Sequence, residues 1–376
     1  MEYDRRKFLK LGLTVGTGLV LGDTGIEGSL SKATSATPKA GRVVSEGVVP
    51  LVAVEGTAYE CGYHYGQIVR EKYPGYRRYL DKAYSWKSIT PEAKKLFERQ
   101  APYILDVYRG LMDADKTEPQ SNGATEETGC SSFGVSGAIT LDGEPISGQT
   151  KDTVLESACL YIVLRMRIKA GPTILVLAYP GEILGYGMWS TGMSIFRNSL
   201  FSTAGAAKGL TMVQWGLLAL AGKTVEQAGE LAKRFGIQEA GNCLISDGTG
   251  KSLSVEFNTG GVSLVPARDG IATHANHPVG RETSLFHGNQ PEIKSSNSYF
   301  RMSRLTELLN NERGRLTVQK AMAALADHKK YPFGICRHLV DKDISTTAAV
   351  IAEPTKGKLH VVRGNPCSAW PVTYNI

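Results

Sequence analysis

Residues 128–133 read TGCSSF and are the most informative stretch of the chain, because they place a glycine and a cysteine at the start of a strand-like run. The preceding residues 120–127 (QSNGATEE) show no apolar periodicity and are rich in loop formers, which predicts an exposed linker. Gly129 has no Cβ, so its backbone can take a strained geometry that opens its carbonyl to attack by the Cys130 thiol. We therefore interpret Gly129–Cys130 as a self-cleavage site that makes Cys130 a new N-terminus.

The α-amine released on Cys130 would lie next to the thiol of the same residue. An unperturbed α-amine has a pKa of roughly 7.7–8.0, near working pH, so it can take the proton of its own side chain. One residue would then supply both the nucleophile and the general base.

A hairpin is predicted directly after Cys130. The Asp-Gly pair at 142–143 lies between two strand-like runs, and this dipeptide is a strong hairpin signal. With this pair as the turn, Phe133 faces Asp152, which returns to within about three residues of Cys130, or roughly 10 Å of strand. The Asp152 carboxylate can then orient the α-amine. The alternative for Asp152 is a strand-end residue in solvent.

For several other polar side chains, the sequence is compatible with two different roles. Asn198 follows a short apolar run and is either a turn residue or an amide donor to an oxyanion. His274 and His277 lie where a strand is expected to run into a loop, and they invite a Cys-His pair or a metal site. No Cys-x-x-Cys or His-Glu-x-x-His motif accompanies them, so no metal is expected. Glu256 is an edge-strand carboxylate or part of a buried polar network, and we favour a structural role.

A series of different short motifs follows along the chain. In order they read GCSSF, GQTKD, GMSIFRN, NCLISD, VE, HANH, a serine followed by an arginine, IC and GNPC. They lie at residues 129–133, 148–152, 192–198, 242–247, 255–256, 274–277, 298 with 301, 335–336 and 364–367. In this order they resemble the isopenicillin N acyltransferase (penicillin acyltransferase) family of N-terminal-nucleophile hydrolases. The likeness runs from about Glu55 to the C-terminus.

This resemblance implies a fold and a mechanism. The fold is of the α+β class, a four-layer αββα sandwich. The residue that matches Cys130 is both the autocleavage nucleophile and the catalytic nucleophile, and the residue that matches Asp152 supports it. The residue that matches Asn198 supplies an oxyanion-hole amide.

The resemblance also implies residues of the substrate pocket. Ser298 and Arg301 fall where the family has polar residues that line this pocket. Thr150-Lys151 stands where many members have an asparagine and an aromatic residue before the aspartate. Lys151 is therefore expected to change the pocket wall, and with it the choice of substrate.

Capping signals and apolar runs predict the regular elements. Thr90 with a following proline opens a helix to about Leu111, Thr224 opens one to Phe235, and Thr317 opens one to about Asp327. Strands are predicted at 174–179, 242–246, 252–257, 346–352 and 358–363. This pattern fits two stacked sheets with helices outside.

Residues 1–36 read as a twin-arginine export signal. The basic stretch DRRKFLK at 4–10 precedes an apolar region at 11–21 that is too short for a convincing membrane span. The chain is expected to use the twin-arginine export machinery and to work in the periplasm or elsewhere outside the cytosol. A retained signal that acts as an anchor stays open. Self-cleavage then gives an N-terminal fragment, 37–129, and a C-terminal fragment, 130–376, which stay together as one folded domain.

Composition limits the function classes. The chain has 376 residues, of which 42% are hydrophobic and 21% are charged, as in ordinary soluble domains. Its net charge of +7 is spread without the Lys/Arg blocks of nucleic-acid binders, so no nucleic-acid partner is expected. The six cysteines define no disulfide framework. Cys159, Cys243 and Cys336 read as buried small hydrophobes, whereas Cys61 and Cys367 are either buried or paired.

Export bears on the type of reaction, because acyl-coenzyme A is not expected outside the cytosol and water is then the favoured acyl acceptor. The sequence therefore predicts a self-processed hydrolase of linear amides, without a cofactor. Its substrate would be an N-acyl amino acid, an acylated amine or a β-lactam side chain. The alternatives are an acyltransferase with an amine acceptor and a non-catalytic binding protein on the same fold.

Overall fold

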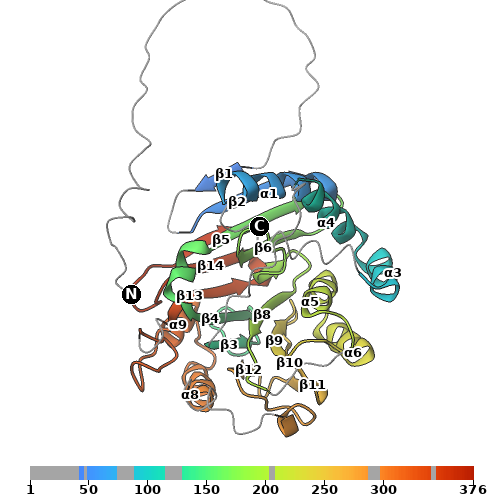
Figure 1. Ribbon diagram of the computed structural model, residues 1–376. Helices are drawn as coiled ribbons and strands as arrows, with labels where there is room; N and C mark the ends of the chain where they lie inside the picture. The colour runs from blue at the N-terminus through green and yellow to red at the C-terminus, as the bar shows by residue number, and fades with distance from the viewer. Residues whose placement is uncertain are drawn as a thin grey trace, which may run out of the picture. The chain divides into compact units, whose positions relative to one another are not determined.

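Two stacked β-sheets form the centre of the computed structural model (Figure 1). The structure describes residues 42–45, 49–73, 89–114, 129–202, 208–286, 297–339 and 344–376. The predicted export signal at 1–36 and the predicted linker at 120–127 lie outside the described residues.

Sheet A has nine strands among the described residues. All neighbouring pairs are antiparallel except β2 and β5, which are parallel. In spatial order the strands are β1 (Arg42–Ser45), β2 (Leu51–Gly56), β5 (Ile162–Ile168), β6 (Thr173–Ala178), β7 (Tyr186–Trp189), β8 (Ser194–Asn198), β9 (Gly241–Ser246), β10 (Ser252–Asn258) and β11 (Gly261–Pro266).

Sheet B has six strands in the described part of the chain, and all of its pairs are antiparallel. In spatial order they are β12 (Ile271–His274), β3 (Gly129–Val135), β4 (Ile146–Val154), β13 (Ile344–Glu353), β14 (Lys358–Arg363) and β15 (Val372–Asn375).

Helices cover the outer face of each sheet. Sheet A is covered by α1 (Ala58–Lys72), α3 (Pro91–Gln100), α4 (Pro102–Ala114), α5 (Met212–Ala221) and α6 (Val225–Phe235). Sheet B is covered by α8 (Ser298–Asn311) and α9 (Val318–Leu325). The predicted four-layer αββα sandwich is confirmed.

The layers follow from strands that are apolar on both faces. In β6, Leu175 and Leu177 pack into the core between the sheets, whereas Ile174 and Val176 pack under the helices. Successive side chains of a strand point to opposite faces, so a continuous apolar run is buried on both sides.

The capped helices show where local signals hold and where one fails. The caps at Thr224 and Thr317 are confirmed, although the second helix ends at Leu325 rather than near Asp327. The long helix predicted from Pro91 to about Leu111 is wrong, because the chain breaks at Ala101 into α3 and α4. A proline at 102 disfavours helical geometry in the preceding residue, which explains the break. Each predicted strand is present, with ends that differ by at most two residues.

The β3–β4 hairpin has a different register from the predicted one. Phe133 pairs with Gly148, and Asp152 pairs with Gly129. The pair at 142–143 does turn, with a φ of +79° at Gly143, but it lies inside a longer loop because β3 already ends at Val135. Asp152 therefore lies directly beside the predicted cleavage site, rather than about three residues away from it.

Within the described residues, no helix has both the length and the apolar character needed to span a membrane.

Candidate active site

Cys130 is fully buried near the start of β3. Its backbone N–H donates to Asn276 Oδ1 at 3.0 Å, and its carbonyl accepts from Arg301 Nη1 at 2.5 Å. The backbone on either side of the predicted nucleophile is therefore held by side chains from distant parts of the chain.

Arg301, on α8, joins three of these groups. The guanidinium is fully buried and also donates to Ser131 Oγ at 2.8 Å and, through Nη2, to Asn276 Oδ1 at 2.6 Å. Asn276 Nδ2 donates to the Ser199 carbonyl at 2.7 Å, which fixes the amide so that its oxygen faces Cys130. Asn276 lies in the HANH motif, from which no role was predicted for it.

Asp152 is fully buried in β4, opposite Gly129. Its Oδ1 accepts from Thr346 Oγ1 at 2.7 Å, and a β-bulge follows Thr346 in the neighbouring strand β13. The carboxylate packs so closely against Gly129 that a Cβ built on this glycine would lie 2.8 Å from Asp152 Oδ2. A side chain at 129 would displace the carboxylate, so the packing of Asp152 requires glycine here.

The carboxyl group of Asp152 lies among cations. Burial raises the pKa of Asp152 above its ordinary value, and the charges of Arg301, Arg337 and Lys151 act in the opposite direction. Burial also lowers the pKa of Arg301, and the Asp152 charge opposes this shift. These charges act with little screening because the groups are removed from water.

Lys151 lies directly opposite Cys130 in the hairpin, so both side chains project from the same face of sheet B. Its ammonium group donates to the Tyr186 hydroxyl at 2.6 Å and lies 4.4 Å from the centre of that ring. Lys151, which was predicted to alter the pocket wall, is therefore buried between the sheets, next to the predicted nucleophile.

Ser298 supports the site from the first turn of α8, one turn before Arg301. Its hydroxyl accepts from the Asn276 N–H at 2.8 Å and bonds His277 Nδ1 at 2.7 Å. Ser298 and Arg301 were both predicted to line the substrate pocket. Both are fully buried. Ser298 holds the loop that carries Asn276, and Arg301 holds strand β3, which carries Cys130.

Asn198 reaches the site from sheet A. Its Nδ2 donates to the Ala275 carbonyl at 2.9 Å and to the His274 carbonyl at 3.3 Å. These bonds fix the loop that presents Asn276 to Cys130. To serve as an oxyanion donor, Asn198 would have to direct one of these hydrogens at the substrate.

His274 and Glu256 form a buried pair on the other side of this loop. His274 Nε2 lies 2.7 Å from Glu256 Oε1, and the carboxylate also accepts from the N–H groups of Val279 and Gly280, each at 2.8 Å. Burial opposes ionisation of Glu256, but the hydrogen bond and charge of His274 hold its pKa below the ordinary value. Because β10 lies between β9 and β11, Glu256 belongs to a buried polar network and not to an edge strand.

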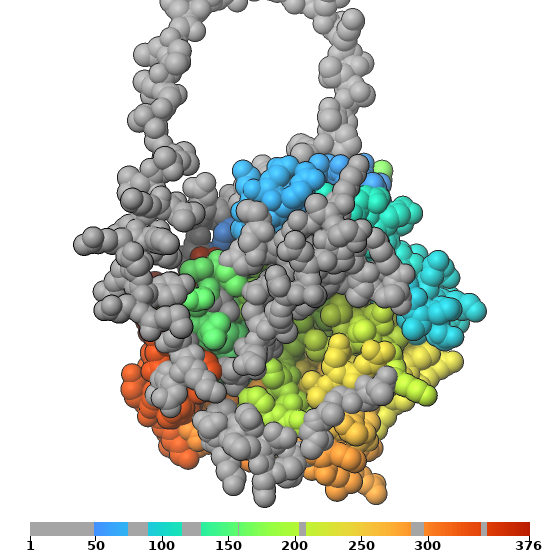
Figure 2. All heavy atoms as spheres, viewed as in Figure 1, coloured from blue at the N-terminus to red at the C-terminus, as the bar shows by residue number. Residues whose placement is uncertain are grey.

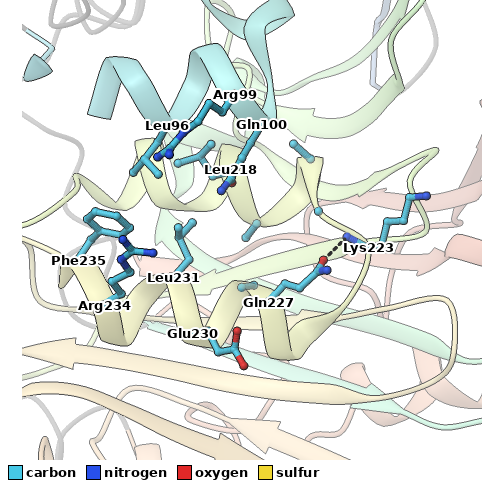
Figure 3. A pocket seen from close by; sticks show the side chains of 14 residues that line it. Leu96, Arg99, Gln100, Leu218, Lys223, Gln227, Glu230, Leu231, Arg234 and Phe235 are labelled. Carbon is cyan, nitrogen blue, oxygen red and sulfur yellow. Dashed lines mark hydrogen bonds between the residues drawn. The ribbon is translucent and has the colours of Figure 1, made fainter. Parts of the chain in front are cut away.

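A cavity of about 690 Å³ lies elsewhere, between α3, α5 and α6, which neighbour one another on the face shown in Figure 2. Figure 3 shows its lining, which includes Leu96, Leu218 and Phe235, and the hydrogen bond from the Lys223 N–H to Gln227 Oε1. These helices cover the outer face of sheet A, whereas Cys130 lies in sheet B.

Comparison with known proteins defines the family. Residues 144–368, more than half of the chain, match the family described as acyl-coenzyme A:6-aminopenicillanic acid acyl-transferase. The chain belongs to this family, as its motifs indicated. It is thus an N-terminal-nucleophile enzyme of the amide hydrolase or acyltransferase kind.

A search of curated proteins finds no match. Among solved structures, the chain is similar to a mutant of the conjugated bile acid hydrolase from Clostridium perfringens, with 13% identity, a TM-score of 0.45 and coverage of 66% of this chain and 97% of that chain. It is also similar to a second variant of that hydrolase, with 12% identity, a TM-score of 0.36 and coverage of 66% of this chain and 89% of that chain. For penicillin V acylase from Agrobacterium tumefaciens the identity is 13% and the TM-score 0.35, with coverage of 68% of this chain and 80% of that chain.

Proposed function

We propose that this chain is an exported, self-processed cysteine hydrolase that cleaves linear amide bonds through an acyl-enzyme. The observation that carries the proposal is the position of the Cys130 nitrogen, which is held by Asn276 Oδ1 and follows the glycine against which Asp152 packs. That nitrogen becomes the α-amine when the bond to Gly129 breaks. In the uncut chain this nitrogen already donates to Asn276 Oδ1.

Processing would proceed as an acyl shift. The Cys130 sulfur attacks the Gly129 carbonyl carbon, the bond to the Cys130 nitrogen breaks, and the nitrogen takes the thiol proton. Water then hydrolyses the thioester, which leaves a carboxylate on Gly129 and a free amine and thiol on Cys130. The fragments are expected to stay together, because β2 of the N-terminal fragment pairs with β5 of the C-terminal one.

Turnover would repeat the same chemistry on a substrate. The α-amine takes the thiol proton, the sulfur attacks the amide carbonyl, and the protonated amine gives its proton to the leaving nitrogen. Water resolves the resulting thioester. Asp152 would orient the α-amine, and Arg301, which shares Asn276 Oδ1 with it, would favour its unprotonated form.

The substrate would be an N-acyl amino acid, an acylated amine or the side-chain amide of a β-lactam. Incubation of the processed protein with one compound of each class, followed by mass spectrometry of the products, tests this proposal. Release of a free acid and a free amine from at least one class is expected. Intact substrates in all three classes, with a correctly processed enzyme, would contradict it.

Acyl transfer is the second candidate, because the matched family is described as an acyl-transferase. The same acyl-enzyme would then be resolved by an amine instead of water. Addition of a primary amine to the assay separates the two reactions. A hydrolase keeps forming the free acid, whereas a transferase diverts most of the acyl group to the new amide.

Asn198→Ala is expected to lower kcat by about 10²-fold with little change in KM, if Asn198 stabilises charge that develops only in the transition state. Asn242→Ala is a matched control, because it removes a buried amide directly opposite Asn198 in strand β9. The control is expected to lower stability while kcat is retained. A near-wild-type kcat in Asn198→Ala would assign the oxyanion donor to another group.

Export is expected to depend on the paired arginines of the signal. The double variant Arg5→Lys, Arg6→Lys keeps the charge but loses the guanidinium groups, so it should trap the protein in the cytosol. Fractionation of cells that express each form, followed by immunoblotting, measures the outcome. Unchanged export of the double variant would remove the proposed localisation outside the cytosol.

A further inference from the structure

Four metal-ligating side chains meet on one side of sheet B. They are His328, Cys336, His338 and Cys367, and their ligand atoms all lie within 4.8 Å of one another. His328 follows α9, Cys367 follows β14, and the other two lie in the segment between α9 and β13. His328, Cys336 and His338 thus share the segment between α9 and β13, and the fold brings Cys367 to them from the segment after β14.

The distances between these atoms suit a single ion. The two sulfurs are 3.6 Å apart, and His338 Nε2 lies 3.7 Å from Cys336 Sγ, 3.4 Å from Cys367 Sγ and 3.0 Å from His328 Nε2. Tetrahedral zinc, with Zn–S near ~2.3 Å and Zn–N near ~2.0–2.1 Å, sets these edges at roughly 3.8 Å for S–S, 3.5 Å for S–N and 3.3 Å for N–N. Each of the four distances lies close to the corresponding edge.

We propose that these four side chains form a Cys₂His₂ zinc site. Protein ligands fill all four positions of the tetrahedron, which is the pattern of a structural site rather than a catalytic one. His328 and Cys367 are exposed, so an ion can reach the site from solvent. This site is additional to the proposed amide chemistry and does not depend on it.

Surrounding polar groups orient the ligands. Asn365 Nδ2 donates to Cys336 Sγ at 3.5 Å and to the Arg337 carbonyl at 2.8 Å. The N–H of Cys336 donates to the Asp327 carbonyl at 3.1 Å, which ties this ligand to the residue before His328. Outer partners of this kind account for about 10–100-fold in metal affinity.

The site would also stabilise the segment next to Asp152. Arg337 lies between two of the ligands, and its N–H donates to Thr346 Oγ1 at 2.8 Å. The same hydroxyl donates to Asp152 Oδ1 at 2.7 Å. An ion that fixes Cys336 and His338 therefore fixes the backbone that positions this pair.

A disulfide between Cys336 and Cys367 is the rival arrangement. Its sulfurs would lie about 2.03–2.05 Å apart, whereas they are 3.6 Å apart here. A disulfide also gives no reason for two imidazoles to converge on the same point. The experiment therefore has to separate a bound ion from an oxidised pair.

The test measures metal and thiols on the full-length protein purified from zinc-supplemented cells. Plasma mass spectrometry is expected to find about one zinc ion per chain, and all six cysteines should titrate as free thiols in denaturant with chelator. The chelator-treated protein should melt several degrees lower and recover with added zinc. Absence of stoichiometric zinc, or loss of the two thiols of Cys336 and Cys367, would overturn the proposal.

Cys367→Ser is the decisive variant, because this ligand is exposed and its replacement disturbs packing least. Cys159→Ser is the matched control, since Cys159 is exposed and lies outside the cluster. Cobalt added to the metal-free control should give thiolate-to-cobalt charge transfer and tetrahedral visible bands. In Cys367→Ser and in His328→Gln, zinc affinity should fall more than about 100-fold while far-ultraviolet circular dichroism stays unchanged. Zinc affinity unchanged in either variant would overturn the site.

Discussion

Cys130→Ala is expected to give a single uncut chain with no amide hydrolysis, whereas the wild type gives two fragments. The reason is chemical, since only a nucleophile at 130 can attack the Gly129 carbonyl, and the same sulfur would form the acyl-enzyme. Denaturing electrophoresis and an assay on any amide that the wild type cleaves measure both effects. Cys159→Ala, which removes an exposed cysteine, should be processed normally. The same two fragments in Cys130→Ala would implicate an outside protease.

Asp152→Asn is expected to slow both self-cleavage and turnover, the latter by about 10²-fold, because proton transfer by a positioned base contributes roughly 10²–10⁴. The pH profile should also move. The carboxylate favours the protonated α-amine, so its removal lowers the pKa of the amine, and activity should rise at lower pH than in the wild type. The measurements are kcat and KM across pH, together with the rate of fragment formation.

The Asp152 variant needs a control for folding, because it removes a buried charge that faces Arg301, Arg337 and Lys151. Thr346→Ser keeps the hydroxyl that bonds Asp152 Oδ1, so it should leave the pH profile unchanged. A thermal melt of both variants shows whether each one folds. An unaltered pH profile in a folded Asp152→Asn would remove Asp152 from the mechanism.

Local sequence signals predicted the sheets and most helix starts, because they depend on neighbours along the chain. The run at 174–179 is apolar on both faces, and the Thr224 cap bonds a residue three positions on. The helix break at Pro102 is also a local effect, and the proline could have located it. The register of the β3–β4 hairpin, in contrast, could not be predicted from local signals. The partner of Asp152 depended on the length of a loop that no dipeptide determines.

The site was only partly predictable. The cysteine and the aspartate were found from motifs, but the support from Asn276, Arg301 and Ser298 depends on how α8 packs beside β3, which requires the tertiary fold. Cysteine burial was likewise uncertain from pattern alone. Cys243 and Cys336 are buried as predicted, but Cys159 is exposed because it lies on a short 3₁₀ helix, Leu155–Leu160, at the edge of the core.

The proposed zinc ligands had no sequence signature. His328, Cys336, His338 and Cys367 match no Cys-x-x-Cys spacing, and the sequence predicted no metal. Their convergence follows from the adjacency of the segments after α9 and β14, which only the three-dimensional fold provides.

The intact mass of the purified protein under denaturing conditions tests the central claim most directly, because cleavage before Cys130 separates an N-terminal-nucleophile enzyme from an inert binding protein. Two masses are predicted, one for a fragment that ends at Gly129 and one for residues 130–376 with a free N-terminal cysteine. A single mass that spans the Gly129–Cys130 bond, in protein that is folded and has had time to mature, would contradict the account.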